Sequence, residues 1–217
     1  MSTIEAGNQS IHRLNGNGRS QTTTSDKQFH FTIDCDWVPG SQIGLKSLLT
    51  YCERRHIKGT VFFAGQFAKT YPELVRECLR RGHQLGTHGW AHGGLEEDED
   101  FRAASYEQQR DWIRRATDAV EKAAGVRPVI FRAPNLRISE TTLRALEDEG
   151  YQYDSSIPAR RFDMGFGRVH YTEYFWAPLE PYNLCGSQIL EIPPSACLFP
   201  INLAALRVLG RRWRGHQ

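Results

Sequence analysis

Two histidines and two aspartates could form a catalytic metal site in this chain. His88 and His92 lie four residues apart in the segment Gly-Thr-His-Gly-Trp-Ala-His-Gly-Gly, and Asp34 and Asp36 lie far upstream, two residues apart. Two imidazoles and one carboxylate bind a divalent metal while leaving coordination positions open for water and substrate. This donor set therefore indicates a metal-dependent hydrolase.

The spacing within each pair indicates how the work is divided. Alternate side chains of a strand point to the same side, so one aspartate could bind the metal while the other acts on the water. The histidine pair differs from the helical zincin motif, because Gly89 stands where that motif has its glutamate base. Gly93 and Gly94 also favour a loop or a single turn.

The elements that must position these residues alternate between short apolar strands and amphipathic helices. Strands are expected at 29–36, 60–64, 84–87, 128–132, 151–155 and 188–192, and helices at 42–56, 72–82, 105–124 and 139–150. The first helix is expected to turn Ile43, Leu45, Leu48, Leu49 and Cys52 inward. The chemically active positions at or just after strand ends are Asp34, Asp36, His88, Arg132 and Asp154. In a parallel barrel these ends converge on one face, where active sites are built.

Arg132 follows an apolar strand in the segment Phe-Arg-Ala-Pro. A guanidinium at such a position must be paired or must face a cleft. A carboxylate of the site is its expected partner.

Taken together, these motifs resemble the polysaccharide deacetylase superfamily, which includes carbohydrate esterase family 4. The resemblance runs from about Phe29 to Pro194. The acidic motif of that family is matched, with one residue inserted, by Thr32-Ile33-Asp34-Cys35-Asp36. The other matches are His88 and His92 for His-x-x-x-His, Arg132 and Pro134 for Arg-x-Pro, and Asp154 and Ser156 for Asp-x-Ser.

The resemblance implies an α/β fold, a distorted (β/α) barrel of about seven parallel strands, and removal of an acetyl group from an N- or O-acetylated sugar or glycan intermediate. Asp34 is implied as general base, oriented by Arg132, with a further catalytic role for Asp154. The implied metal ligands are Asp36, His88 and His92. Zinc is the first choice, although cobalt, nickel, iron and manganese also suit imidazole and carboxylate donors.

Two departures from the family pattern affect the site. Asn135 stands where the family usually has a tyrosine that supplies a backbone N–H to the oxyanion, a role that tolerates the change. The histidine that acts as general acid after the last apolar run, here 190–194, has no close counterpart, since His170 precedes the run and His216 lies far beyond it. The expectation is that the chain ends before that strand, so the barrel would be incomplete at its C-terminus.

Substrate contacts are expected from rings and turn residues close to the motifs, because flat rings suit sugar faces. The candidates are Trp37, Trp90, Pro134 and Asn135, with a further aromatic segment at 171–176. An acetylated sugar or glycan is the expected partner, and the oligomeric state stays open.

Composition bounds the remaining possibilities. The net charge of +2 gives no field that favours nucleic acid, and no apolar stretch is long enough to cross a bilayer. Residues 1–27 are polar and are expected to form a disordered leader, with 28–217 as one catalytic domain. Five cysteines without Cys-x-x-Cys spacing favour a reducing, cytoplasmic compartment. The acidic run at 96–100 is interpreted as a solvated loop.

Three alternatives stay open. A cyclic-amide hydrolase of the same superfamily would use the same metal-bound water on a small, non-sugar substrate. A two-histidine, one-carboxylate iron oxygenase shares the ligand count but usually has a scaffold of many short strands. A glycan-binding or scaffold protein that has lost turnover would account for the missing acid.

Overall fold

The structure is a computed structural model. It describes residues 30–92, 99–159, 176–184 and 186–194, together with the backbone of two short paired strands, β6 (Asp163–Gly165) and β7 (Arg168–His170). The expected leader at 1–27, the aromatic segment at 171–175 and the tail with His216 lie outside the described residues.

The core of the fold is a seven-stranded sheet in the order β1-β2-β3-β4-β5-β9-β8. Its strands are β1 (Phe31–Cys35), β2 (Gly59–Phe63), β3 (Gln84–Thr87), β4 (Ile130–Phe131), β5 (Tyr153–Asp154), β8 (Tyr182–Asn183) and β9 (Leu190–Glu191). Successive pairs from β1 to β9 are parallel, and only β8 pairs antiparallel with its neighbour. The expected α/β class is confirmed. Within the described residues no pairing joins β1 to β8, so these strands form an open rather than a closed barrel.

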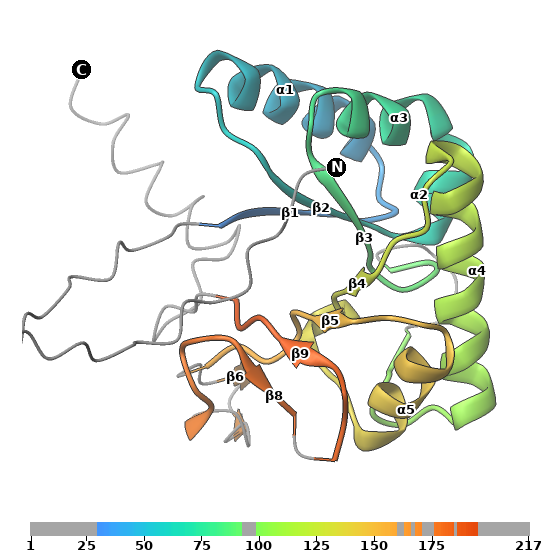
Figure 1. The fold of residues 1–217 in the computed structure, drawn as a ribbon, viewed down its shortest axis with the longest axis vertical. Helices are drawn as coiled ribbons and strands as arrows, with labels where there is room; N and C mark the ends of the chain where they lie inside the picture. The colour runs from blue at the N-terminus through green and yellow to red at the C-terminus, as the bar shows by residue number, and fades with distance from the viewer. Residues whose placement is uncertain are drawn as a thin grey trace, which may run out of the picture.

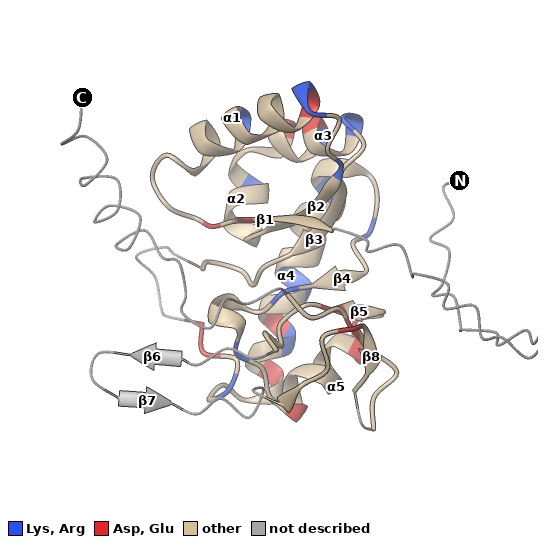
Figure 2. Ribbon diagram, turned by 90° about the vertical axis from the view of Figure 1, so that its left-hand side faces the viewer, with Lys and Arg blue, Asp and Glu red and all other residues tan. Residues whose placement is uncertain are grey.

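Helices cover the outer side of this sheet (Figure 1). They are α1 (Ser41–Arg54), α2 (Gly65–Thr70), α3 (Pro72–Arg80), α4 (Tyr106–Ala124) and α5 (Glu140–Asp148). The long helix α4 packs against α2, α3 and α5. Acidic and basic residues are intermixed along these helices, as expected from the low net charge (Figure 2).

Local sequence signals account for most helix ends. The Ser105 hydroxyl accepts a hydrogen bond from the backbone N–H of Gln108 at the start of α4, and Gly125 ends that helix with φ at 75°. Ser139 and Thr142 form a reciprocal capping box at the start of α5. The expected bounds of these helices are thus confirmed to within one or two residues, whereas the short helix α2 was not predicted.

Helix α1 buries a narrower stripe than its sequence predicted. Leu45, Leu49 and Cys52 are buried, but Ile43 and Leu48 are 66% and 40% exposed. The inward prediction was therefore wrong for these two residues, because only the stripe spaced by four and three residues turns towards the apolar core.

Strand β2 lies inside the sheet and is buried at all five residues, as is usual for a parallel strand covered on both faces. Gly59 at its start has no room for a side chain, since a Cβ atom there would lie 2.1 Å from the carbonyl oxygen of Phe31 on β1. The strands β1 and β2 therefore come together in one register, which fixes the position of Asp34 on β1 and of Asp36 directly after it.

Two further expectations concern membrane-spanning segments and the cysteines. Within the described residues, no helix is long and apolar enough to cross a membrane. Cys35, Cys52 and Cys78 are buried free thiols, and burial raises the pKa of each of them. Cys185 and Cys197 lie outside the described residues.

Candidate metal centre

A cavity of about 240 Å³ lies where the C-terminal ends of the parallel strands meet. Its lining includes four of the residues predicted to carry the chemistry, supplied by β1 and by the loop after β3, and three from the turn that follows β4. The lining residues are Asp34, Asp36, His88, His92, Asn135, Leu136 and Arg137. The expected convergence of strand ends therefore occurs.

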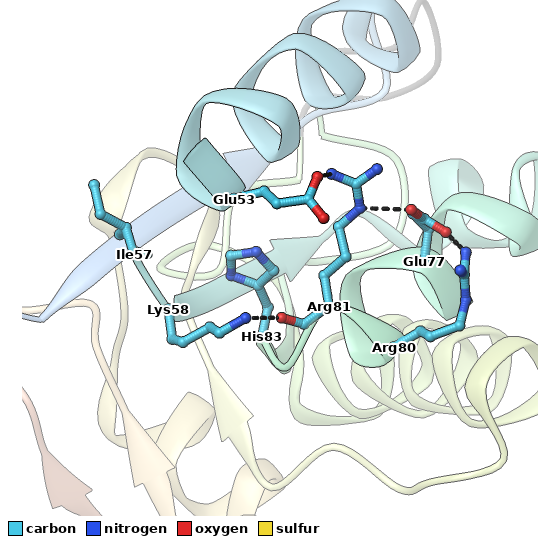
Figure 3. Close-up of a pocket in the computed structure, with 7 residues that line it drawn as sticks. All are labelled: Glu53, Ile57, Lys58, Glu77, Arg80, Arg81 and His83. Atoms are coloured by element: carbon cyan, nitrogen blue, oxygen red, sulfur yellow. Dashed lines mark hydrogen bonds and ion pairs between the residues drawn. The ribbon is translucent and has the colours of Figure 1, made fainter. Parts of the chain in front are cut away.

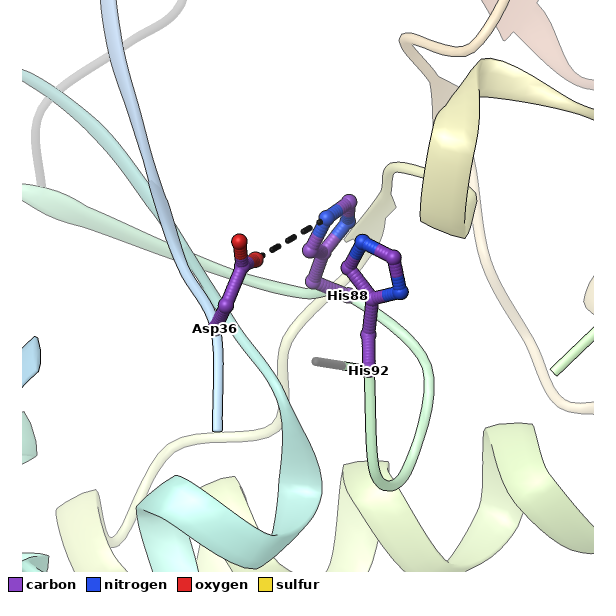
Figure 4. A group of neighbouring side chains, drawn as sticks. All are labelled: Asp36, His88 and His92. Atoms are coloured by element: carbon purple, nitrogen blue, oxygen red, sulfur yellow. Dashed lines mark ion pairs between the residues drawn. The ribbon is translucent and has the colours of Figure 1, made fainter. Parts of the chain in front are cut away.

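Asp36, His88 and His92 lie close enough together to share one metal ion (Figure 4). One possible ligand atom of each lies within 4.8 Å of those of the other two, and His88 Nε2 lies 3.5 Å from Asp36 Oδ1. Ligand atoms of a tetrahedral zinc site with bonds of about 2.0–2.1 Å are separated by roughly 3.3 Å. Asp36 Oδ1 is also buried and has no hydrogen-bond partner within the described residues. The three side chains therefore fit a divalent ion with only small movements.

The orientation of His88 is fixed by the main chain. Its Nδ1 lies 2.8 Å from the carbonyl oxygen of Arg132, and the ring is buried. Because a carbonyl only accepts, Nδ1 carries the proton, which leaves the Nε2 lone pair facing Asp36. This arrangement is the usual outer hydrogen bond of a metal-binding histidine.

The loop that carries both histidines, residues 88–92, is referred to below as the histidine loop. It rests on the start of α2, where the backbone N–H groups of Gly65 and Gln66 donate to the carbonyl oxygens of Gly89 and Trp90 at 3.0 and 2.7 Å. The short helix α2, which was not predicted from the sequence, thus supports the histidine loop through backbone N–H groups that have no acceptor within the helix.

Two further bonds tie the histidine loop to the rest of the site. The backbone N–H of Trp37 donates to the carbonyl of His92 at 2.8 Å, which joins the end of β1 to the loop. The backbone N–H of Trp90 lies 2.8 and 3.0 Å from the two carboxylate oxygens of Glu99. Glu99 is only 3% exposed. The prediction of a solvated acidic loop is therefore wrong at this residue, because its carboxylate receives a buried backbone donor.

Arg132 is buried and has the expected carboxylate partner. Its Nη1 donates to Asp34 Oδ1 at 2.7 Å and to the Thr32 hydroxyl at 3.0 Å. Its Nε and Nη2 donate to the carbonyl and the hydroxyl oxygen of Ser155, and its guanidinium lies 4.3 Å from the centre of the Phe62 ring. Four bonds and a ring face hold this side chain, so Asp34 meets a guanidinium in a fixed position.

Asp154 lies behind the cavity and not in its lining. It is fully buried and accepts a hydrogen bond from the Ser156 hydroxyl at 2.6 Å, while the backbone N–H of Ala133 donates to the same hydroxyl oxygen at 2.8 Å. The structure therefore connects Asp154 by hydrogen bonds to the turn after β4, and its charge also interacts with that of Arg132.

A second buried carboxyl, Glu191, lies beside Asp154 in the parallel register of β5 and β9. Its Oε1 accepts from the backbone N–H of Ile157 at 3.0 Å. Burial raises the pKa of both carboxyls, and the negative charge of Asp154 raises that of Glu191 further. The pair therefore holds a proton at neutral pH. Glu191 was not predicted to belong to the site, although a glutamate within the apolar run Ile-Leu-Glu-Ile is a signal for such a buried pairing.

The turn after β4 has an unusual backbone. Asn135 and Leu136 both have positive φ, at 57° and 56°, and Leu136 is one of few non-glycine residues in that region. The backbone N–H groups of Leu136 and Arg137 donate to the carbonyls of Ala133 and Pro134 at 3.0 and 3.3 Å. Leu136 and Arg137 line the cavity but were not predicted to belong to the site.

The predicted substrate contacts divide into two groups. Asn135 is exposed at the cavity, and the buried Pro134 lies directly beside it in the turn. Trp90 is instead 8% exposed and packs in the apolar core against Gly65, with the guanidinium of Arg115 4.1 Å from its ring centre. The structure does not bring Trp90 to the cavity, because its ring fills the space that Gly65 leaves.

Trp37 is half-buried, and its ring centre lies 6.2 Å from that of Tyr71. It is not part of the cavity lining. Its link to the site is the backbone bond to His92, so the contact that the structure gives it is with the histidine loop.

A second cavity, of about 400 Å³, lies at the opposite ends of the strands, next to the starts of β2 and β3 (Figure 3). Its charged groups bond to one another: Arg81 bonds to Glu53 at 2.8 Å and to Glu77 at 2.5 Å, and Lys58 donates to the Arg81 carbonyl. Its lining carries no metal-binding cluster, since the one such cluster within the described residues is that of Asp36 and the two histidines. The first cavity is therefore the candidate functional site.

Comparisons with known proteins show what the chain as a whole is similar to. A family model described as polysaccharide deacetylase matches residues 21–153. A peptidoglycan deacetylase-like protein of Gibberella zeae is 32% identical over 118 residues, which is 54% of this chain and 33% of the relative. A peptidoglycan deacetylase of Helicobacter pylori is 26% identical over 128 residues, 59% of this chain and 42% of the relative. The chain thus spans less than half the length of these relatives.

A solved structure of a polysaccharide deacetylase family protein from Mycobacterium smegmatis has the same fold. It superposes with a TM-score of 0.60 at 22% identity, covering 86% of this chain and 71% of that one.

Proposed function

We propose that this chain, which belongs to the polysaccharide deacetylase family, removes acetyl groups from N- or O-acetylated sugars or glycans with the help of a divalent metal ion. The observation that carries the proposal is the metal-binding cluster of Asp36, His88 and His92 in one cavity with the Asp34–Arg132 pair. The names of the two curated relatives, both concerned with peptidoglycan, support a glycan as the substrate class.

The metal would be held by Asp36, His88 and His92. When bound, a divalent ion polarises the acetyl carbonyl and lowers the pKa of a coordinated water. Zinc suits this donor set best, and cobalt, nickel, iron and manganese remain open. The bond from His88 Nδ1 to the Arg132 carbonyl supports this role, because it presents the other ring nitrogen as a ligand.

Asp34 is proposed as the general base that takes the proton of the attacking water. Its side chain lines the cavity and is 38% exposed, so it is accessible to a substrate. Arg132 holds one of its oxygens at 2.7 Å and thereby keeps the carboxylate in one orientation. Through its carbonyl, Arg132 also orients His88, so one residue supports both the base and a ligand.

Asn135 is proposed to stabilise the developing oxyanion through its backbone N–H. It lies exposed at the cavity, and the turn that carries it is anchored by the bond from Ala133 N–H to Ser156. Donors that are fixed in advance stabilise such a charge without reorganisation. In this proposal Asp154 and Ser156 are positioning residues that act through this turn.

The experiment compares Asp34→Asn and Asp36→Asn with the unaltered chain, loaded with zinc, on acetylated chitooligosaccharides and peptidoglycan fragments. Asp34→Asn should bind zinc as before but release acetate about 10²–10⁴-fold more slowly, which is the usual contribution of a general base. Asp36→Asn should bind zinc more weakly and regain part of its activity at higher zinc concentration.

The same assay separates the alternatives. Ring opening of a cyclic amide without acetate release would favour the small-substrate hydrolases. Glycan binding that is insensitive to chelator, with no acetate release from any substrate, would favour a protein without turnover. If Asp34→Asn released acetate as fast as the unaltered chain, the proposed role of Asp34 would be wrong.

A further inference from the structure

Arg137 is an exposed arginine in the lining of the cavity that holds the metal-binding cluster. Two arginines elsewhere, the half-buried Arg110 and the exposed Arg127, use their charge within the protein: Arg110 bonds to Glu149 at 2.7 Å and Arg127 to Glu121 at 2.9 Å. Among the described residues, the side chain of Arg137 has no hydrogen bond, ion pair or ring contact. Because this charge lies in the lining of the cavity, a ligand bound there can reach it.

The main chain holds Arg137 in a fixed place at the cavity. It follows two successive residues with positive φ, Asn135 and Leu136, a backbone that a leucine rarely adopts. The backbone N–H of Arg137 donates to the Pro134 carbonyl, and that of Leu136 to the Ala133 carbonyl. Strain of this kind persists where the surroundings impose it, and it is concentrated at ligand sites.

The charges of the cavity leave Arg137 without a partner to neutralise it. The carboxylate of Asp34 is already paired with Arg132, and Asp36 lies beside two imidazoles in a set that suits a cation. With a divalent cation in place, the cavity would be positive on balance. A ligand with a negative group would therefore be favoured there over a neutral one.

We infer that Arg137 determines substrate specificity by binding an anionic substituent, a carboxylate or a phosphate, on the acetylated sugar. This inference rests on the proposed function for the sugar itself. The planar guanidinium pairs with either anion through two parallel hydrogen bonds. The cavity is small, about 240 Å³, so the anionic group would lie on the acetylated sugar residue or directly next to it.

The test measures binding by calorimetry with three probes in the Asp34→Asn background, in which turnover is expected to be about 10²–10⁴-fold slower. The probes are a neutral N-acetylglucosamine oligomer, an oligomer containing N-acetylmuramic acid, and the sugar nucleotide UDP-N-acetylglucosamine. Arg137→Gln is compared with Arg54→Gln, a control at the exposed end of α1 and outside the cavity. Thermal unfolding verifies that both variants fold.

The protein with Arg137 unaltered should bind one anionic probe at least tenfold more tightly than the neutral oligomer. Arg137→Gln should remove this preference and leave the neutral affinity unchanged, Arg137→Lys should restore part of it, and Arg54→Gln should change nothing. A preference for the muramic acid oligomer identifies a glycan carboxylate, and one for the sugar nucleotide identifies a phosphate.

Equal affinities for all three probes, or a preference that survives Arg137→Gln, would overturn the inference. Failure to bind any probe would overturn it as well. Acetate release from the neutral oligomer, measured separately with Asp34 intact, reports on the proposed function alone. An anionic preference that depends on Arg137 without any acetate release would thus retain the binding role and remove the deacetylase.

Discussion

Glu99 provides a test of how the histidine loop is held. Its two carboxylate oxygens lie 2.8 and 3.0 Å from the backbone N–H of Trp90, in the middle of the loop. The substitution Glu99→Ala would remove this acceptor and leave the N–H buried without it. A buried donor without a partner costs about 1–3 kcal/mol.

The effect on metal binding follows from that cost. If the loop loses about 2 kcal/mol of support, conformations with misplaced histidines gain population by about 30-fold. The apparent affinity for zinc falls with the fraction of molecules that are competent to bind. We therefore expect Glu99→Ala to weaken zinc binding by up to about 30-fold, the full effect being reached where misplaced conformations already predominate without metal. Glu99→Gln should lose less, because its amide oxygen still accepts one bond.

The assay is competition for zinc with a coloured chelator, together with unfolding by urea. Glu180, an exposed glutamate away from the cavity, gives the matched control Glu180→Ala, which should bind zinc as the unaltered chain does. A zinc affinity of Glu99→Ala within twofold of this control would refute the reasoning. It would mean that α2 and β1 hold the loop without help from Glu99.

Three further substitutions test other parts of the support. Ser156→Ala should lower the free energy of unfolding by about 3 kcal/mol, because it leaves the buried N–H of Ala133 without an acceptor and removes a donor to Asp154; a loss below about 1 kcal/mol in urea unfolding would contradict this. Gly65→Ala should cost about 1–3 kcal/mol, since its Cβ would lie 2.5 Å from the Trp90 ring, whereas Gly44→Ala, with nothing within 4 Å, should cost nothing. Folding raises the pKa of the buried Glu191 carboxyl, so near neutral pH the folded chain keeps a proton that the unfolded chain releases. The contribution of Glu191 to the free energy of unfolding is therefore fully present below about pH 4. It falls by up to about 1.4 kcal/mol per pH unit as the pH rises towards neutral. Because the pKa of Asp154 is raised only to about 6, Glu191→Gln should abolish the slope of unfolding stability between pH 6 and 8, and an unchanged slope there would show that Glu191 does not hold the proton.

The strand ends could be predicted because their signals are local. Short apolar runs, each followed by a polar residue, placed Asp34, His88 and Arg132 correctly on the sheet, and the partner of Arg132 followed from the cost of burying an unpaired guanidinium. Capping residues such as Ser105 and Ser139 likewise predicted where helices begin.

What the sequence did not indicate depends on contacts between distant segments. Helix α2 has six residues and too little periodicity to stand out, yet it supports the histidine loop. Glu99 was expected in solvent because its neighbours are acidic, and only the fold shows that a buried backbone donor faces it. Trp90 was expected at the substrate because of its place between the histidines, whereas its ring packs against Gly65.

The bond from Trp37 N–H to the His92 carbonyl has a consequence for altering this protein. It joins the two segments that carry the ligands through main-chain atoms, which no substitution at Asp36 or His92 removes. Ligand types could therefore be exchanged, for example Asp36→His, to shift the preference among transition metals while the scaffold keeps its shape. This site offers a starting point for redesigning metal selectivity one side chain at a time.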